Sequence, residues 1–450
     1  MASHIVTSAD IPADGERLES SKVDKIKMLA GGLSLILTLI SFFLLFGAGE
    51  AIAGSYAYSW LFALFFFFTL AVGGCFWTLL HNVSNSGWGT SVRRVMENLG
   101  SVYPYLFIFA IPLLFPQVQQ YLYEWMTMHR DISGSWFGLG AKEALHHSHN
   151  PHDHLLYLKY WYMSIPFWYF RFAFYFVGLS LVIRGLRKLS VAQDSDPNPG
   201  TSRLFRARYH STYTLIIFAI TITFAGFDWL MGLDYTWFST MWGVYLFAGS
   251  ALNSMAVIII TCALLTQAGY MKKVVTPEHF HIKGKLLLAF TIFWAYVSFS
   301  QFFLIWYANI TEETKYFLIR NTEGWNTGMI ALVFGHFVVP FVILLQAWLK
   351  RNPKMISIMC IYTLVMHILD HYLIVAPERS ISLMNILPNV YGAGSENPVT
   401  TTVPGAFIGD ILAFVAIGSG FVFFYLRALG QNNLYPNRDP RLLESANVSN

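Results

Sequence analysis

Two histidines and an aspartate share one face of a predicted helix within an apolar run. The stretch "MHILDHYLIV", residues 366–375, places His367, Asp370 and His371 at positions i, i+3 and i+4, which lie on the same side of an α-helix. Imidazole and carboxylate groups exchange protons near neutral pH, and each lowers the other's cost of becoming charged. The pattern therefore predicts proton transfer. The alternative is a set of hydrogen bonds that only holds neighbouring helices together.

The composition indicates that these polar residues belong to a membrane protein. Of the 450 residues, 55% are hydrophobic and 12% are charged, about half the charged fraction of soluble proteins, and the mean hydropathy is +0.48. The formal net charge of +4 is too small to suggest a nucleic-acid partner. The three cysteines lie far apart and form no CxxC or CxxCH, so neither a thiolate metal site nor a covalently attached haem is expected.

Ten apolar runs are long enough to cross a bilayer, since a spanning helix needs about 20 mostly apolar residues. The runs are Ile26–Ala48, Tyr56–Leu80, Leu99–Phe115, Trp161–Ile183, Ser211–Phe227, Phe238–Leu265, Leu286–Tyr307, Thr327–Trp348, Met355–Val375 and Val403–Leu426. The third has a short apolar core that contains Pro104 and Pro112. The sequence therefore predicts an all-α polytopic membrane protein, with tails at 1–25 and 429–450 and a ten-helix membrane domain at 26–428.

Positively charged residues are distributed unevenly between the two sides of this predicted bundle. Both tails and the even-numbered loops hold 22 of the 29 Lys and Arg residues, whereas the odd-numbered loops hold six. Because such residues accumulate in cytoplasmic loops, both termini are predicted to be cytoplasmic. The long connections at 116–160 and 376–402 then face outside, and the second is expected to be irregular because it is rich in Gly, Pro and Asn.

Two neighbouring runs bring further polar groups to a similar depth. At 1.5 Å per residue, His367 lies roughly 12 Å, His336 roughly 14 Å and Asp410 roughly 10 Å from the outer ends of their runs. We therefore expect imidazoles and carboxylates from three consecutive helices to converge in the outer half of the membrane. This convergence favours proton transfer over packing alone.

Three more charged residues lie in or beside apolar runs. A charge at mid-bilayer costs at least about 2.5–3.5 kcal/mol, so Arg171 in "FWYFRFAFYF" is expected to pair with an acid on a neighbouring helix. Asp228 and Asp234, in "GFDWLMGLDY", fall at the outer end of the fifth run and in the next loop, where they either line a proton exit or are simply solvated. The candidate proton-transfer residues are His336, His367, Asp370, His371, Asp410, Asp228, Asp234 and Arg171.

Haem and metal sites have weaker sequence support. A haem-bearing bundle needs pairs of histidines on facing helices, and His336 with His367 forms at most one such pair. The outer tract "HHSHNPHDH" at 146–154 has a composition that can bind zinc or copper, but a flexible polar loop is the alternative, and we assign no metal ligand. Without a phosphate-binding glycine loop, GxSxG or HExxH, no bond-making chemistry is expected from the chain alone.

Three stretches resemble one family of membrane subunits. The stretch "HNVSNSGWGTSVRRVMENLGSVYPY", residues 81–105, resembles a signature of the NrfD/polysulfide-reductase membrane-subunit superfamily. The stretches "FDWLMGLDYTWFSTMWGVYLFAGS" at 227–250 and "HILDHYLIVAPE" at 367–378 resemble one branch of it. That branch is the second NrfD-like membrane subunit of bacterial alternative complex III, a quinol:cytochrome c oxidoreductase. The resemblance covers essentially all ten predicted helices.

This resemblance implies a subunit of a respiratory complex in the bacterial inner (cytoplasmic) membrane, surrounded by lipids. Its partners would be an iron–sulfur protein, a multihaem cytochrome c and a related NrfD-like subunit, so the iron–sulfur clusters and c-type haems lie in partner subunits. The related subunit binds menaquinol, which places menaquinone nearby, while this chain resembles the subunit associated with proton movement. The implied function is a proton path coupled to quinol oxidation. The alternatives are a passive structural anchor and an autonomous secondary transporter.

Overall fold

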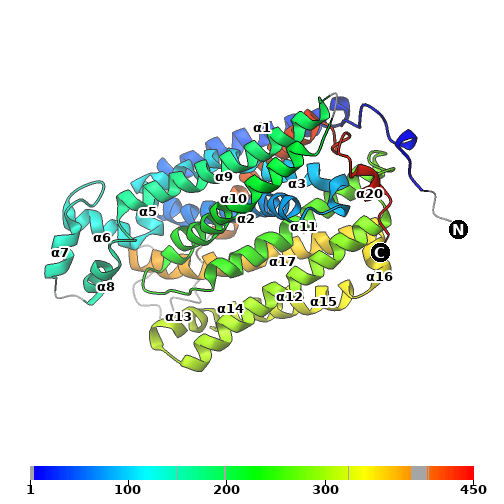
Figure 1. The fold of residues 1–450 in the computed structure, drawn as a ribbon. Helices are drawn as coiled ribbons and strands as arrows, with labels where there is room; N and C mark the ends of the chain where they lie inside the picture. The colour runs from blue at the N-terminus through cyan, green and yellow to red at the C-terminus, as the bar shows by residue number, and fades with distance from the viewer. Residues whose placement is uncertain are drawn as a thin grey trace.

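The fold is a bundle of long helices. A computed structural model describes residues 5–148, 151–196, 199–322, 324–386, 403 and 405–449. Within these ranges the secondary structure is helical and contains no strand. Ten helices are long and apolar enough to cross a membrane, and most of them run side by side along one common direction (Figure 1). The predicted all-α class and the number of spans are confirmed.

Eight of the spans are single long helices. They are α1 (Ser20–Phe46), α2 (Glu50–Ser84), α9 (Ile165–Asp194), α10 (Ser202–Trp229), α11 (Trp242–Gln267), α12 (Pro277–Ala308), α17 (Pro353–Ile386) and α19 (Ala406–Gln431). Several of these helices begin earlier or end later than the apolar runs suggest. Polar first and last turns add little to hydropathy but continue the same backbone hydrogen bonding, so composition underestimates helix length.

The third and eighth spans are interrupted. The third, Trp88–Leu114, consists of short helical segments that include α3 (Arg93–Gly100) and α4 (Phe107–Ala110), and Pro104 and Pro112 each stand in the first turn of a 3₁₀ segment. Proline is tolerated there because its missing N–H would have no helical partner. The eighth consists of α14 (Trp325–Ala331), a π-helical segment (Leu332–Val338) and α15 (Val339–Leu344).

Helix α2 forms the centre of the bundle. Its sequence is apolar on all sides, as expected for a helix surrounded by others, and it packs against α10, α11, α17 and α19. Two glycines allow close approach. A Cβ on Gly73 would lie 2.1 Å from Ser254 Oγ of α11, and one on Gly74 would lie 2.6 Å from the Gly100 backbone nitrogen. Small residues at such crossings are a common means of helix association in membranes.

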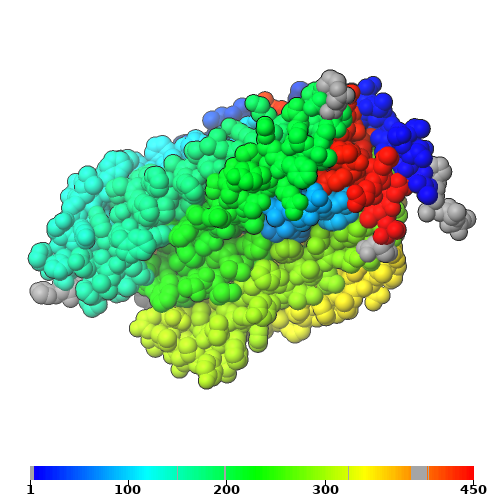
Figure 2. Space-filling view, in the orientation of Figure 1, coloured from blue at the N-terminus to red at the C-terminus, as the bar shows by residue number. Residues whose placement is uncertain are grey.

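Both chain ends lie at the same end of the bundle. The Val6 N–H donates to Asn447 Oδ1 at 2.7 Å, and the Leu434 N–H donates to the Glu16 carbonyl at 2.8 Å. Figure 2 shows the first and last segments packed against each other there. This arrangement is the one that an even number of spans requires.

The opposite end carries the long connections. Helices α6–α8 project beyond the bundle at this end (Figure 1), so the predicted connection at 116–160 is mainly helical. The short helices at this end are α5 (Pro116–Leu122), α6 (Glu124–Ser133), α7 (Ala141–His147), α8 (Pro151–Lys159) and α13 (Thr311–Arg320). The other short helices are α16 (Ala347–Arg351) and α20 (Leu442–Ala446).

The expectation that an irregular segment begins at Ala376 is wrong for its first part. Helix α17 continues to Ile386 with Pro377 inside it, although an internal proline removes a backbone hydrogen bond. The remainder of the predicted connection, 387–402, lies outside the described residues. The longer helix brings Glu378 and Arg379 into the bundle as helical residues.

Candidate functional site

Helix α17 presents the histidine–aspartate face to the interior. His367, Asp370 and His371 are each at most 2% exposed, and Phe66 of α2 packs against both histidine rings at 5.6 and 5.9 Å between centroids. The rings of His367 and His371 lie 4.1 Å apart in an edge-to-face arrangement. The three side chains lie on one face of α17, as their spacing in the sequence predicts.

Asp370 is held by neutral donors from two other helices. The Tyr245 hydroxyl of α11 donates to Oδ1, and the Trp294 indole N–H of α12 donates to Oδ2 at 3.2 Å. His367 Nδ1 lies 3.5 Å from Oδ2, but it makes no hydrogen bond in the described structure. Among the described residues, no Lys or Arg forms an ion pair with Asp370. Its only charge partner is therefore an imidazole that can itself gain or lose a proton.

His336 joins this cluster from the eighth span. It lies in the π-helical segment, which is a type of irregularity often found at functional sites. Its ring is 4.1 Å from the Trp294 ring and 6.0 Å from the His367 ring. Neither ring nitrogen of His336 or of His367 has a hydrogen-bond partner among the described residues. These nitrogens are free to take up a proton, a water molecule or a metal ion. We call His336, His367, Asp370 and His371 the histidine cluster.

Three members of the histidine cluster could also hold a metal ion. One ligand atom each from His336, His367 and Asp370 lie within 4.8 Å of one another, and imidazole nitrogen with carboxylate oxygen is a ligand set that zinc accepts. The sequence predicted that His336 would lie at the depth of His367 and Asp370, and the structure brings the three side chains together. In the described part of the outer tract at 146–154, no comparable group forms.

A small cavity extends outward from Asp370. Its volume is about 40 Å³, which is room for a few water molecules, since each needs roughly 10–15 Å³ by this measure. Polar side chains contribute much of its lining, namely Tyr245, Ser298, Gln301, Tyr316, Arg320 and Asp370. The Gln301 carbonyl oxygen is buried without a partner in the described structure. The cavity can therefore hold polar ligands between Asp370 and Arg320.

Arg171 and Asp228 form a buried ion pair apart from this cavity. The Arg171 guanidinium donates to both carboxylate oxygens of Asp228 at 2.8 and 2.7 Å, and the hydroxyls of Tyr175 and Tyr162 donate to the same carboxylate at 2.6 and 3.0 Å. The prediction that Arg171 pairs with an acid on a neighbouring helix is confirmed. Asp228 is 5% exposed, so it is not the solvated group that one interpretation expected.

Asp410 is also held by an arginine rather than by the histidine cluster. Arg379 of α17 donates to its two oxygens at 2.7 and 3.1 Å, and Ser59 of α2 donates at 2.6 Å. The sequence placed Asp410 as a proton-exchange partner of Asp370, whereas the structure surrounds it with these donors. Because guanidinium does not lose its proton in proteins, the positive charge beside Asp410 is fixed.

Asp234 lies in the short connection between α10 and α11. Lys315 contacts it at 2.7 Å and Thr236 donates to it through its hydroxyl. Burial alone would raise the pKa of Asp234, but the bonds from Lys315 and Thr236 outweigh burial and lower its pKa below the usual value. Asp234 therefore stays ionised at neutral pH and links the loop to α13.

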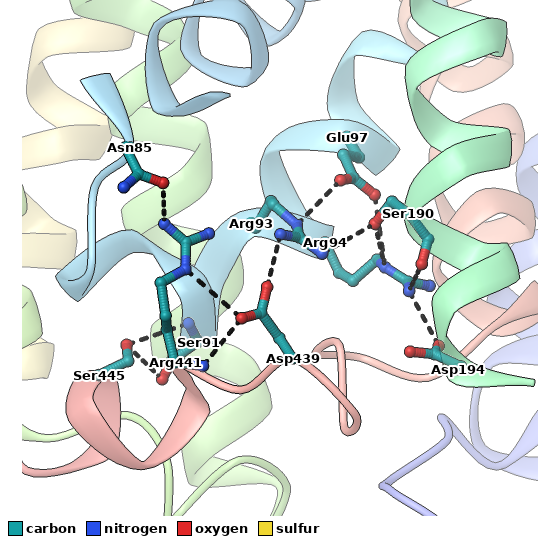
Figure 3. A network of polar contacts seen from close by, with 10 residues as sticks. All are labelled: Asn85, Ser91, Arg93, Arg94, Glu97, Ser190, Asp194, Asp439, Arg441 and Ser445. Carbon is teal, nitrogen blue, oxygen red and sulfur yellow. Dashed lines mark hydrogen bonds and ion pairs between the residues drawn. The ribbon is translucent and has the colours of Figure 1, made fainter. Parts of the chain in front are cut away.

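The end of the bundle that carries the chain termini contains a further group of arginine-paired acids (Figure 3). Arg93 contacts Glu97 at 3.3 Å and Asp439 at 2.8 Å, and Arg94 contacts Asp194 at 2.8 Å. These contacts join α3, α9 and the C-terminal segment, and Figure 3 shows the side chains converging between them. Within the described part of the chain, Asp370 differs from these buried acids because no arginine neutralises it.

Several residues of the site escaped the sequence reasoning. Tyr245 and Trp294 look like ordinary aromatic core residues, and nothing in their spacing marks them as donors to a carboxylate. Arg320 and Arg379 were counted as outer-loop residues, yet both are at most 4% exposed. The available signal was Pro377, because a proline within a continuing helix leaves a carbonyl that needs another donor.

Comparison with known proteins does not assign the chain to a family. No model of a protein family matches the sequence, and no curated protein matches it.

Proposed function

We propose that this chain carries protons through the membrane, with Asp370 as the group that binds and releases them. One observation carries the proposal: Asp370 is a buried carboxylate whose neighbours are neutral donors and histidines. A carboxylate in an apolar interior must bind a proton or face a charged partner. With arginine absent from its described contacts, either Asp370 or a nearby imidazole takes the proton, and the adjacent cavity offers a route outward.

His367 is the nearest exchange partner. Its Nδ1 lies 3.5 Å from Asp370, so a small movement would bring the two groups within hydrogen-bond distance. His371 Nδ1 contacts the His367 carbonyl at 3.3 Å, which leaves its Nε2 free in the described structure. His336 extends the set toward the eighth span. Both oxygens of Asp370 already accept hydrogen bonds, an arrangement that suits proton exchange better than capture of a metal ion.

We further propose that the chain is the second NrfD-like membrane subunit of an alternative complex III. The resemblances at 81–105, 227–250 and 367–378 support this assignment, as does the bias of Lys and Arg, which predicts cytoplasmic termini. In that complex an iron–sulfur protein, a multihaem cytochrome c and a related NrfD-like subunit hold the redox groups, with menaquinone nearby. Proton movement here would be coupled to quinol oxidation in the partners, in a bacterial inner membrane.

Replacement of Asp370 by asparagine tests the relay. We expect Asp370→Asn to keep its assembly, because the amide has a similar volume, its oxygen can accept from the Trp294 N–H, and its NH2 can donate to the Tyr245 hydroxyl oxygen. Proton release per electron, measured in vesicles that contain the purified complex, should fall to the background. The matched control is Asp410→Asn, which removes a buried carboxylate that Arg379 holds and should leave the ratio unchanged in protein that assembles.

The alternatives predict different results. A passive anchor predicts that Asp370→Asn lowers thermal stability while proton release per electron stays normal. An autonomous transporter predicts a chain that purifies without iron–sulfur or multihaem subunits. Normal coupling in a well-assembled Asn variant would mean that the histidine cluster only packs helices together.

A further inference from the structure

Arg320 occupies the outer end of the cavity that begins at Asp370. It is the last residue of α13 and is 1% exposed. Arg320 lines the cavity, and its guanidinium contacts Glu378 at 3.1 Å. It also lies at one end of a wider cleft of about 790 Å³, which is lined mainly by apolar residues of α12, α13 and the eighth span. A permanent positive charge thus stands between Asp370 and the outer face.

The proline of α17 explains why this arginine is bound there. Pro377 has no N–H, so the Leu373 carbonyl four residues earlier lacks its helical donor. Arg320 Nε donates to that carbonyl at 2.8 Å, and Nη2 donates to the next carbonyl, of Ile374, at 2.8 Å. The guanidinium therefore replaces the missing helical bond while its charge remains beside the cavity.

Neighbouring contacts hold Arg320 in this position. Its guanidinium carbon lies 3.5 Å from the centre of the Tyr316 ring, and the Tyr316 ring stacks on Trp237 with centroids 4.4 Å apart. One residue before Tyr316, Lys315 pairs with Asp234 at 2.7 Å. Helix α13 is thus fixed to the loop after α10, and the arginine side chain has few alternative positions.

We propose that Arg320 is the outer gate of the proton path. The inference rests on the proposed relay through Asp370. A guanidinium that lines a narrow, low-dielectric cavity raises the energy of an excess proton there, which is how arginine excludes protons and cations from some channels. Glu378 pairs with Arg320 but does not line the cavity, so it offsets this charge only in part. Arg320 keeps protons of the outer solution from reaching Asp370 at rest. During turnover, the exit opens when the guanidinium leaves Glu378 and the two α17 carbonyls that hold it at rest.

The test is passive proton flow through vesicles that contain the purified full-length chain, with a pH-sensitive dye inside and an imposed pH gradient. Arg320→Gln removes the charge, and we expect proton entry to become faster by about tenfold, the effect of removing a modest barrier. Arg320→Lys keeps the charge but loses the planar pair of bonds to α17, so its vesicles should stay tight although the protein is less stable. This pair separates charge from hydrogen bonding.

A second pair of variants guards against misfolding. Pro377→Ala restores an N–H for the Leu373 carbonyl, so the double variant Pro377→Ala with Arg320→Gln removes the charge without leaving that carbonyl unbonded. Vesicles with Pro377→Ala alone should admit protons as slowly as wild-type vesicles, and vesicles with the double variant should admit them faster. If the double variant is well folded and its vesicles admit protons as slowly as wild-type vesicles, Arg320 is not the gate.

Combination with Asp370→Asn distinguishes failure of the gate from failure of the relay. If protons pass through Asp370, then adding Asp370→Asn to Arg320→Gln should abolish the leak. A leak that persists in this combination would place the conduction elsewhere and overturn both proposals. Tight Arg320→Gln vesicles, together with lost proton release in Asp370→Asn alone, would overturn the gate and leave the relay standing.

Discussion

Asp228 in α10 and Asp370 in α17 are both almost fully buried carboxylates, at 5% and 2% exposure, yet their surroundings differ in kind. Asp228 receives two hydrogen bonds from Arg171 and two from tyrosine hydroxyls. Asp370 receives one each from Tyr245 and Trp294, and its nearest possible charge partner is His367. One carboxylate faces a cation that keeps its proton, and the other faces two neutral donors and an imidazole that can gain or lose a proton.

This difference assigns the two sites to different tasks. A bidentate arginine pair is a strong, directional contact, and it neutralises the carboxylate without any change of protonation. An imidazole can both bind and release a proton, so a carboxylate beside it can pass a proton on. We infer that Asp228 with Arg171, and Asp410 with Arg379, hold helices together. Proton transfer is left to the histidine cluster.

The largest effect on stability is expected at the arginine pair. Arg171→Gln leaves Asp228 buried with an uncompensated charge, and breaking such a pair costs about 3–5 kcal/mol. We expect a strongly lowered thermal unfolding temperature and poor assembly, monitored by size-exclusion chromatography and intrinsic fluorescence.

A double-variant cycle sharpens this prediction. Arg171→Gln combined with Asp228→Asn removes both charges, so it should be more stable than Arg171→Gln alone. If the double variant were no more stable than the single one, the cost would come from packing rather than from an unpaired charge.

His129 supplies a third case, a buried histidine without a carboxylate. It lies in α6 at 0% exposure, and its ring contacts Trp125 and Tyr160. Burial, and secondarily the charge of Arg130, lowers the pKa of His129 from 6.5 to about 4. The unfolded chain therefore takes up the proton first as the pH falls, so stability is full above 6.5 and declines between 6.5 and about 4 by roughly 1.4 kcal/mol per pH unit at most.

Thermal unfolding over this pH range checks the contribution of His129. Wild-type protein should lose stability faster than His129→Gln as the pH falls from 6.5 toward 4, because glutamine cannot bind the proton. Parallel pH profiles for the two proteins would contradict a neutral, buried His129.

The fold was largely accessible from the sequence. Apolar run length predicts ten spans because the hydrocarbon core imposes a minimum length on each helix, and Pro104 and Pro112 mark the interrupted third span. The end of α17 was not accessible. Pro377 argues for a helix boundary, and the helix continues because Arg320, 57 positions earlier in the sequence, supplies a replacement donor.

The same boundary error hid part of the site. The apolar run predicted that α17 ends at Val375, which would leave Arg379 in a loop. An ion pair between Arg379 and Asp410 was therefore not expected, and Asp410 remained a candidate for the relay. By contrast, the face formed by His367, Asp370 and His371 depends only on spacing within one helix, and spacing predicted it. The donors Tyr245 and Trp294 depend on how three helices pack, which no local pattern in this sequence specifies.

Infrared spectroscopy of carboxyl groups tests the central claim most directly. As the pH of the purified protein is lowered from neutral, a buried carboxylate that takes up a proton gains the C=O stretching band of a carboxylic acid. We expect such a band in the wild type, its loss in Asp370→Asn, and its retention in Asp228→Asn and Asp410→Asn. A band that persists in Asp370→Asn, or that disappears in either of the other two variants, would contradict the division between titrating and arginine-held carboxylates.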